Sequence, residues 1–319
     1  MTVSIRAIGA SRTAPHDIEA LSGSLSAERL AALKRGGITS FQACGDDVFE
    51  MAAAAALDAV ARAGIPPDDV DALIVVSESL WEAPDAPGRA PHLVFRDRML
   101  RRLVIDAGFR NAAATLQWAG ACGNFAPGLR AARALVSDGA SRNVILVLAD
   151  RLNPATPRLV ENGGAVLSDL AAAVLLDDRP ASLELVRVVL HPSQGVLAPR
   201  TEANFVLQAR ELQKALRGLD GRLAAELGCR LAAFDRVIVE TFADEMIQFA
   251  CEVLQLPRDR VLTPGRGAHG HAFSADLPLS LRCAAVQRDI QPGDFVGCLS
   301  ISSWMLSLCA VQVGPLCTG

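Results

Sequence analysis

Stretches of apolar residues of strand length alternate with helical segments along most of the chain. Asp46–Gly64 is rich in alanine and places apolar residues at helical spacing, so it predicts a helix that ends at Gly64, before two prolines. The apolar runs are continuous, which is typical of strands covered on both faces. This order predicts a layered α/β architecture. The first predicted strands are Ser4–Ala10, Asp71–Ser77, Ala112–Gln117, Asn143–Ala149 and Leu167–Leu176.

A second series of strands and helices follows in the same order as the first. Because the order repeats without evident residue identity, it predicts two similar halves packed back to back. The strands of this series are Ser182–Val189, Arg236–Thr241, Arg260–Thr263, Asp294–Ser300 and Trp304–Val313, and its helices are Thr201–Leu227, Ala243–Leu256 and Leu277–Ile290.

The composition is that of an ordinary globular protein. With 319 residues, of which 51% are hydrophobic, the chain is able to bury a sizeable core. The net charge of −4 is mixed along the sequence, which excludes the basic surface that nucleic-acid binding requires. The apolar runs are far shorter than the roughly 20 residues that cross a bilayer, and the first residues lack a signal-peptide layout. We therefore expect a cytoplasmic protein with no nucleic-acid or membrane partner.

The eight cysteines are scattered singly, and none belongs to a C-x-x-C arrangement. Without a secretion signal they are expected to be reduced thiols. The five histidines do not combine with them at ligand spacing, so no metal is expected. Four cysteines in apolar stretches are expected to be small buried hydrophobes. These are Cys251, Cys283, Cys298 and Cys309.

The most distinctive junction is Trp118–Asn124, between the strand at Ala112–Gln117 and a helix at Phe125–Ser137. It places Cys122 at a strand-to-helix turn. Free backbone N–H groups and the helix dipole at such a position lower a thiol pKa, and the thiolate is the nucleophile that attacks a thioester. An inert buried thiol is the alternative reading. We expect Cys122 to be the nucleophile.

Several motifs together resemble one known family. A-G-A-C-G-N-F around Cys122, then N-V-I-L-V-L-A-D and L-S-D-L-A-A-A-V-L-L, are similar to the β-ketoacyl-ACP synthase III group of the thiolase superfamily. The resemblance continues through R-V-L-T-P-G-R-G-A-H-G-H and covers nearly the whole chain. It implies a thiolase-like α/β fold with two similar βαβαβαββ halves in five layers, α-β-α-β-α. Residues 1–178 would form the half with the nucleophile, and residues 179–319 the half with the opposing ionisable groups.

The resemblance also assigns site residues, and several differ from the family pattern. The cysteine is kept as Cys122, but Glu240 takes the place of the histidine of H-Q-A-N, and H-G-N reads His269-Gly270-His271, so that His271 replaces the asparagine. The oxyanion loop reads Ile301-Ser302-Ser303, ahead of Trp304. Arg35 matches an arginine near the pantetheine arm of coenzyme A. The predicted substrate contacts are Arg35, His269, Trp118, Ser302 and Trp304, with both tryptophans lining the pocket.

These replacements change the expected reaction. The family histidine and asparagine stabilise an enolate, whereas an ionised Glu240 has the wrong charge, so we expect no ordinary malonyl condensation. A carboxylate and an imidazole suit proton removal from an acceptor. We therefore expect acyl transfer from a coenzyme A or carrier-protein thioester to an O, N or C nucleophile of a small molecule in secondary metabolism. Cys122, His271 and Glu240 would be nucleophile, base and orienter, and no cofactor is needed. A solvated turn residue is the alternative for His271.

A different class of function stays open at this point. Loss of the family histidine, asparagine and oxyanion glycines favours a catalytically silent thiolase-fold subunit that supports an active partner. In either case an unpaired sheet edge predicts a homodimer, or a heteromer with a related chain. Asp244, Glu245 and Glu252 lie on the helix that usually offers basic residues to the acyl carrier protein, so this surface is expected to repel an acidic carrier.

Overall fold

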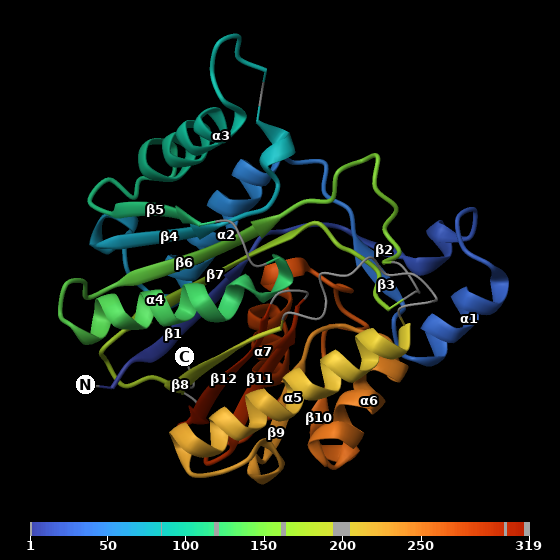
Figure 1. Cartoon of the computed structure of the whole chain (residues 1–319). Helices are drawn as coiled ribbons and strands as arrows, with labels where there is room; N and C mark the ends of the chain where they lie inside the picture. The colour runs from blue at the N-terminus through green and yellow to red at the C-terminus, as the bar shows by residue number, and fades with distance from the viewer. Residues whose placement is uncertain are drawn as a thin grey trace.

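The structure, a computed structural model, describes residues 2–83, 85–117, 121–160, 164–193, 205–302 and 305–315. Its N-terminal half contains β1 (Ser4–Ala10), β4 (Ala72–Val76), β5 (Ala113–Gln117), β6 (Val144–Asp150) and β7 (Leu170–Asp177). Its C-terminal half contains β8 (Leu183–Pro192), β9 (Arg236–Val239), β10 (Val261–Leu262), β11 (Phe295–Ile301) and β12 (Met305–Val313). These strands form one sheet in the order β10-β9-β11-β12-β8-β1-β7-β6-β4-β5 (Figure 1).

Helices cover the outer face of each half of the sheet. On the N-terminal half these are α2 (Val48–Ala63) and α3 (Pro91–Leu100), and on the C-terminal half α5 (Phe205–Leu227) and α6 (Asp244–Leu254). Helix α2 follows its predicted limits because the Asp47 carboxylate accepts a hydrogen bond from Glu50 N, and Gly64 adopts a left-handed φ of 67°. The predicted start of α5, at residues 201–204, lies outside the described residues.

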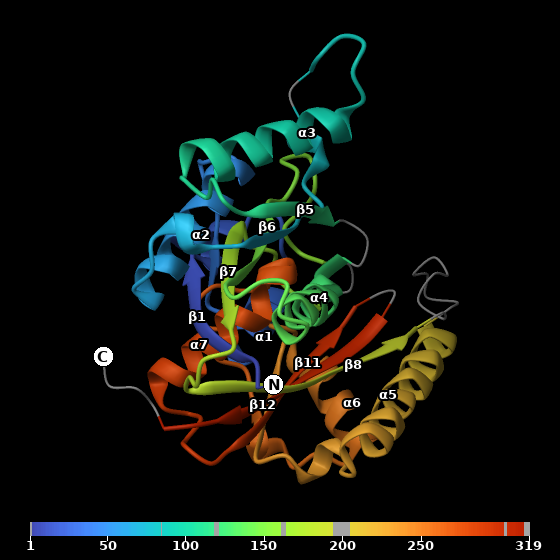
Figure 2. The same cartoon turned by 90° about the vertical axis from the view of Figure 1, so that its left-hand side faces the viewer.

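Two further helices form a middle layer between the halves. Helices α4 (Phe125–Ser137) and α7 (Asp276–Gln287) contribute to one apolar cluster that includes residues of both halves of the sheet. Figure 2 shows them between the two groups of strands. Continuous burial of β6 and β7 on both faces follows from this arrangement. The layers are therefore α-β-α-β-α, as the family resemblance implied.

The two halves meet through a short strand pair. Strand β1 pairs with β8 only at Ser4 with Glu184 and Ile5 with Leu183, and the predicted boundary at residue 178 falls between β7 and β8. Helix α1 (Ala27–Arg35) and the β2 (Pro15–Asp17)–β3 (Ser40–Gln42) pair lie beside the layers. Further helical turns are η1 (Ile18–Leu21), η2 (Pro67–Asp69), η3 (Leu80–Glu82), the π-helix η4 (Arg101–Asp106), η5 (Ala121–Asn124), η9 (Leu231–Ala233), η10 (Arg258–Arg260) and η11 (Phe273–Ala275). No helix among the described residues is long and apolar enough to cross a membrane.

Candidate active site

The fold brings the beginnings of the two middle-layer helices together. Cys122 lies in η5, directly before α4, while His271 lies just before η11 and α7. The turns η5 and η11 contact each other. Residues that are 149 positions apart in the sequence therefore meet at one end of the middle layer.

A hydrogen-bonded chain links Cys122, His271 and Asp276. Nε2 of His271 lies 3.0 Å from Sγ of Cys122, and Nδ1 lies 2.7 Å from Oδ2 of Asp276. His271 is 2% exposed and Asp276 is fully buried. Since a carboxylate accepts, Nδ1 carries the hydrogen and Nε2 faces the thiol. This is the order of nucleophile, base and orienting carboxylate found in catalytic triads.

The backbone and the neighbouring Phe242 ring fix the position of His271. Its N–H donates to the carbonyl of Val166 at 2.8 Å, and its carbonyl accepts from Ser168 N at 2.9 Å. The imidazole stacks on Phe242, with ring centroids 5.3 Å apart. Gly270 is needed in this loop because its φ is 64°, and an added Cβ would lie 3.0 Å from both Ser168 Oγ and Val166 O.

Among these three hydrogen-bonded residues, Cys122 has a pKa that differs from the expectation. Burial raises the pKa of the Cys122 thiol, although the contact with His271 opposes this rise. The predicted depressed pKa was therefore wrong: Cys122 precedes α4, whose N-cap is Asn124, and desolvation outweighs the favourable neighbours. Burial by itself would lower the pKa of His271, but Cys122 and Asp276 hold that pKa well above its ordinary value. Asp276 thus stabilises the charged imidazole that forms when His271 takes the thiol proton.

The hydrogen-bond donors around Asp276 keep its carboxylate ionised. Burial would raise the pKa of this carboxyl, yet hydrogen bonds with His269 and His271 keep the pKa well below its usual range. It also accepts from Thr241 N at 2.7 Å and from Thr241 Oγ1 at 3.0 Å. Its position at the start of α7 suits a negative charge as well.

The predicted orienting role of Glu240 is corrected by this geometry, because Asp276 occupies that position. Glu240 follows β9, and its carboxylate accepts hydrogen bonds from Ser300 Oγ and Ile301 N, each at 2.9 Å. Burial raises the pKa of Glu240 to about 7. Asp276 was missed, although it stands five residues after His271 at the start of a predicted helix.

Comparisons with known proteins agree with this architecture. Residues 224–307 match the model of the 3-oxoacyl-[acyl-carrier-protein] synthase III C-terminal family. The chain is 26% identical over 265 residues to the β-ketoacyl-[acyl-carrier-protein] synthase III of Geobacillus kaustophilus, with 77% of each sequence covered. It is similar in fold to ChlB3, described as an acyltransferase, with a TM-score of 0.78, 21% identity and 99% of each chain covered. The 3-oxoacyl-(acyl carrier protein) synthase III of Pseudomonas aeruginosa gives a TM-score of 0.76 at 19% identity, again with 99% of each chain covered.

The chain is similar in sequence to β-ketoacyl-ACP synthase III proteins and shares their thiolase-like fold. The predicted family resemblance and thiolase-like fold are confirmed.

In this synthase III-like protein, the other predicted site residues are not part of the Cys122–His271–Asp276 chain. Ser302 is buried, and its hydroxyl donates to Met305 O at 2.7 Å. An added Cβ on Gly123 would lie 2.5 Å from Ser302 Oγ, so this glycine allows the loop to pack beside Cys122. Trp118 and Trp304 lie outside the described residues.

Arg35 and His269 lie in two cavities. Arg35 is exposed at the end of α1 and lines a cavity of about 190 Å³. Asp244 lines the same cavity, but Arg266 Nη1 approaches it at 2.6 Å, which offsets part of the acidic charge expected on α6. His269 is buried beside Asp276 and lines another cavity. Among the described residues, no group of three or more His, Cys, Asp or Glu side chains is arranged to hold a metal ion.

Proposed function

We propose that this protein is an acyltransferase in which Cys122 takes an acyl group from a coenzyme A or carrier-protein thioester. The acyl group then passes to an oxygen or nitrogen nucleophile of a small molecule in secondary metabolism. The hydrogen-bonded chain from Cys122 through His271 to Asp276 carries this proposal. The synthase III relatives and ChlB3, described as an acyltransferase, favour acyl chemistry of the same general kind.

The loading step uses the thiol and the imidazole. Nε2 of His271 takes the proton of Cys122 while Sγ attacks the thioester carbonyl carbon. The bond from that carbon to the donor sulfur then breaks, and the departing thiolate receives the proton from His271. The products are an acyl-cysteine and a free donor thiol.

The transfer step repeats the proton movement on the acceptor. His271 removes the proton from a hydroxyl or amine of the acceptor, whose oxygen or nitrogen attacks the acyl carbon. The carbon–sulfur bond of the acyl-cysteine breaks, and Sγ regains a proton from His271. Asp276 orients the imidazole and stabilises its charged form throughout both steps.

The surroundings of Glu240 support transfer to a heteroatom rather than malonyl decarboxylation. An enolate needs hydrogen-bond donors. Glu240 occupies the place of a family histidine, and its carboxylate already accepts from Ser300 Oγ and Ile301 N. An ionised carboxylate there would repel the developing negative charge. A carbon acceptor that arrives as an enolate is therefore disfavoured too.

The assembled chain of three residues favours an enzyme over a silent subunit. A subunit without chemistry has no need for a histidine between a thiol and a buried carboxylate. Dimerisation stays a prediction, supported by β5, which ends the described sheet and has partly exposed or exposed side chains along its length.

Intact-mass measurement with a panel of acyl-coenzyme A thioesters tests the proposed function. We expect one acyl group on the wild-type protein and none on Cys122→Ala. Cys229→Ala, which removes a partly exposed thiol elsewhere, is the matched control and should acylate normally. Release of labelled carbon dioxide from malonyl-coenzyme A, dependent on Cys122, would contradict the heteroatom assignment, and an adduct that persists in Cys122→Ala would contradict the nucleophile.

A further inference from the structure

A second cysteine–histidine pair lies on the other oxygen of Asp276. Nε2 of His269 is 3.4 Å from Oδ1 of Asp276, and Cys283 lies close enough to this histidine to help raise the pKa of its imidazole. Cys283 lies about two helical turns after Asp276 on α7. The proposed acyl-transfer steps use neither His269 nor Cys283.

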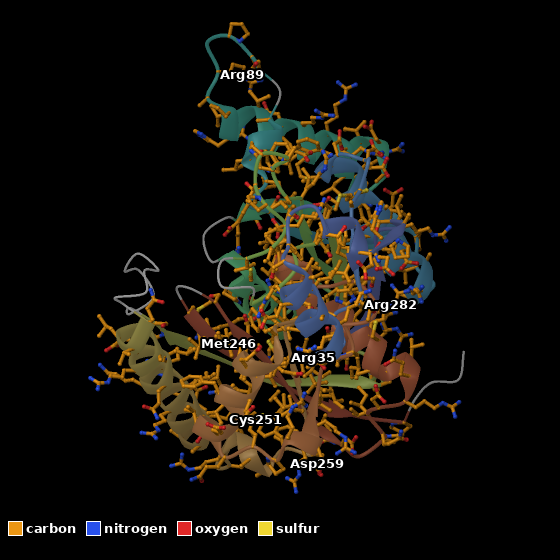
Figure 3. All side chains as sticks on the ribbon, turned by 90° about the vertical axis from the view of Figure 1, so that its right-hand side faces the viewer. Arg35, Arg89, Met246, Cys251, Asp259 and Arg282 are labelled. Atoms are coloured by element: carbon orange, nitrogen blue, oxygen red, sulfur yellow. The ribbon has the colours of Figure 1, made fainter. Side chains whose placement is uncertain are left out.

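This pair opens into a cavity of about 440 Å³. The described lining of the cavity includes His269 and Cys283 but neither Cys122 nor His271. Cys283 is partly exposed, which corrects the prediction that it is a buried hydrophobe, whereas Cys251, Cys298 and Cys309 are buried as expected. In Figure 3, Arg282 lies on the same side of the molecule as Arg35 but apart from it.

The charges around the cavity favour an anionic ligand. Burial would lower the pKa of His269, but Asp276 and Cys283 raise it to about 9, so near neutral pH the charged imidazole forms an ion pair with the buried Asp276 carboxylate. Arg12 is exposed at the cavity, and Arg282 lines it while pairing with Asp58 at 3.1 Å. A positive imidazole beside a thiol also favours nucleophilic attack by that thiol.

We propose that this cavity is a second reactive site, where Cys283 exchanges with a small anionic disulfide. Sγ of Cys283 attacks one sulfur of the disulfide, and the original sulfur–sulfur bond breaks as the mixed disulfide forms. The proton of Cys283 leaves with the departing thiolate, which becomes a free thiol. The incoming disulfide is the oxidant, and His269, Arg12 and Arg282 attract its negative groups.

Glutathione disulfide, which is anionic at neutral pH, is the probe for this site. We expect intact mass and peptide mapping to show one glutathionyl group on Cys283, formed at least about tenfold faster than on Cys229. Cys283→Ser should lose this adduct, and Cys229→Ser should keep it. Arg12→Gln should slow the reaction about threefold to tenfold at low ionic strength and much less at high ionic strength.

The cationic disulfide cystamine supplies the contrasting measurement. It should react with Cys283 more slowly than glutathione disulfide does. Equal rates for the two disulfides would overturn the anionic assignment. The proposal as a whole fails if Cys283 stays unmodified in the folded protein, or if it reacts no faster than Cys229. None of these results depends on acyl transfer.

Discussion

Asp276 binds one histidine through each carboxylate oxygen, and the two cysteine–histidine pairs that result differ in the length of that contact and in their surroundings. On one side Nδ1 of His271 lies 2.7 Å from the carboxylate, and its Nε2 contacts Cys122. Next to Cys122, Gly123 packs against Ser302. On the other side Nε2 of His269 lies 3.4 Å away, and Cys283 lines a cavity of about 440 Å³.

This difference in contact length suits the two histidines to different roles. A short bond to a buried carboxylate fixes the tautomer and orientation of His271, which a general base requires. The longer contact at His269 leaves a charged neighbour for a thiol that lines a cavity. One carboxylate thus supports a tightly hydrogen-bonded site for acyl chemistry, here called the closed side, and a cavity-lining site for exchange, here called the open side.

The largest expected effect is that of Asp276→Asn on the closed side. The amide loses the negative charge that raises the basicity of His271, so acylation of Cys122 should fall by about 10²- to 10⁴-fold. Glu240→Gln is the matched control, because it also neutralises a buried carboxylate near Cys122 but leaves the His271 bond intact, and it should slow acylation less than about tenfold. Rapid-quench intact mass measures both rates. Equal losses in the two variants would mean that Asp276 has no special role.

The pH dependence of stability tests the second buried carboxylate. The pKa of Glu240 is raised from 4.5 to about 7. Its contribution to stability is fully present below the unfolded pKa and is lost as the pH rises through the folded pKa. Between pH 5 and 8, the wild type should therefore lose about 2–3 kcal/mol more unfolding free energy than Glu240→Gln. Denaturant titrations at several pH values measure this difference, and parallel curves would place the Glu240 pKa in its ordinary range.

Packing on the closed side is tested by Gly123→Ala. The new Cβ would lie 2.5 Å from Ser302 Oγ, so the loop must move, at a cost of about 1–3 kcal/mol of unfolding free energy. Gly45→Ala is the control, because a Cβ at Gly45 meets nothing within 4 Å. Thermal melts should separate the two variants. Equal stability would show that the Cys122 loop is not tightly packed.

The sequence predicted most of the layered fold because buried strands and capped helices leave local signals. The α2 helix shows this, with its Asp47 cap and terminal Gly64. The short pair β2–β3 and helix α1 were missed. Strand β2 is three exposed residues, so it carries no apolar pattern to reveal it.

The candidate site was predicted less completely because its contacts are made between distant segments. Cys122 and His271 were chosen from their motifs, and the structure brings them within 3.0 Å. The orienting carboxylate was sought at Glu240 because that residue matched a family position. Which carboxylate faces the imidazole depends on the path of the loop into α7, and neither composition nor spacing encodes that path.

The smallest effect on acylation should come from His269→Asn, which alters only the open side. Asp276 would keep its hydrogen bonds from His271 and Thr241, so it should stay ionised and continue to orient His271. Acylation of Cys122 should therefore fall by less than about fivefold, because the 2.7 Å hydrogen bond between His271 and Asp276 is left intact. Exchange at Cys283 should fall more than this, because the positive charge beside the thiol is gone. Both rates are measured on one preparation by intact mass and peptide mapping, with a thermal melt to confirm folding. If acylation falls as far as in Asp276→Asn while the fold is retained, the two pairs act as one unit and the separation between the closed and open sides is wrong.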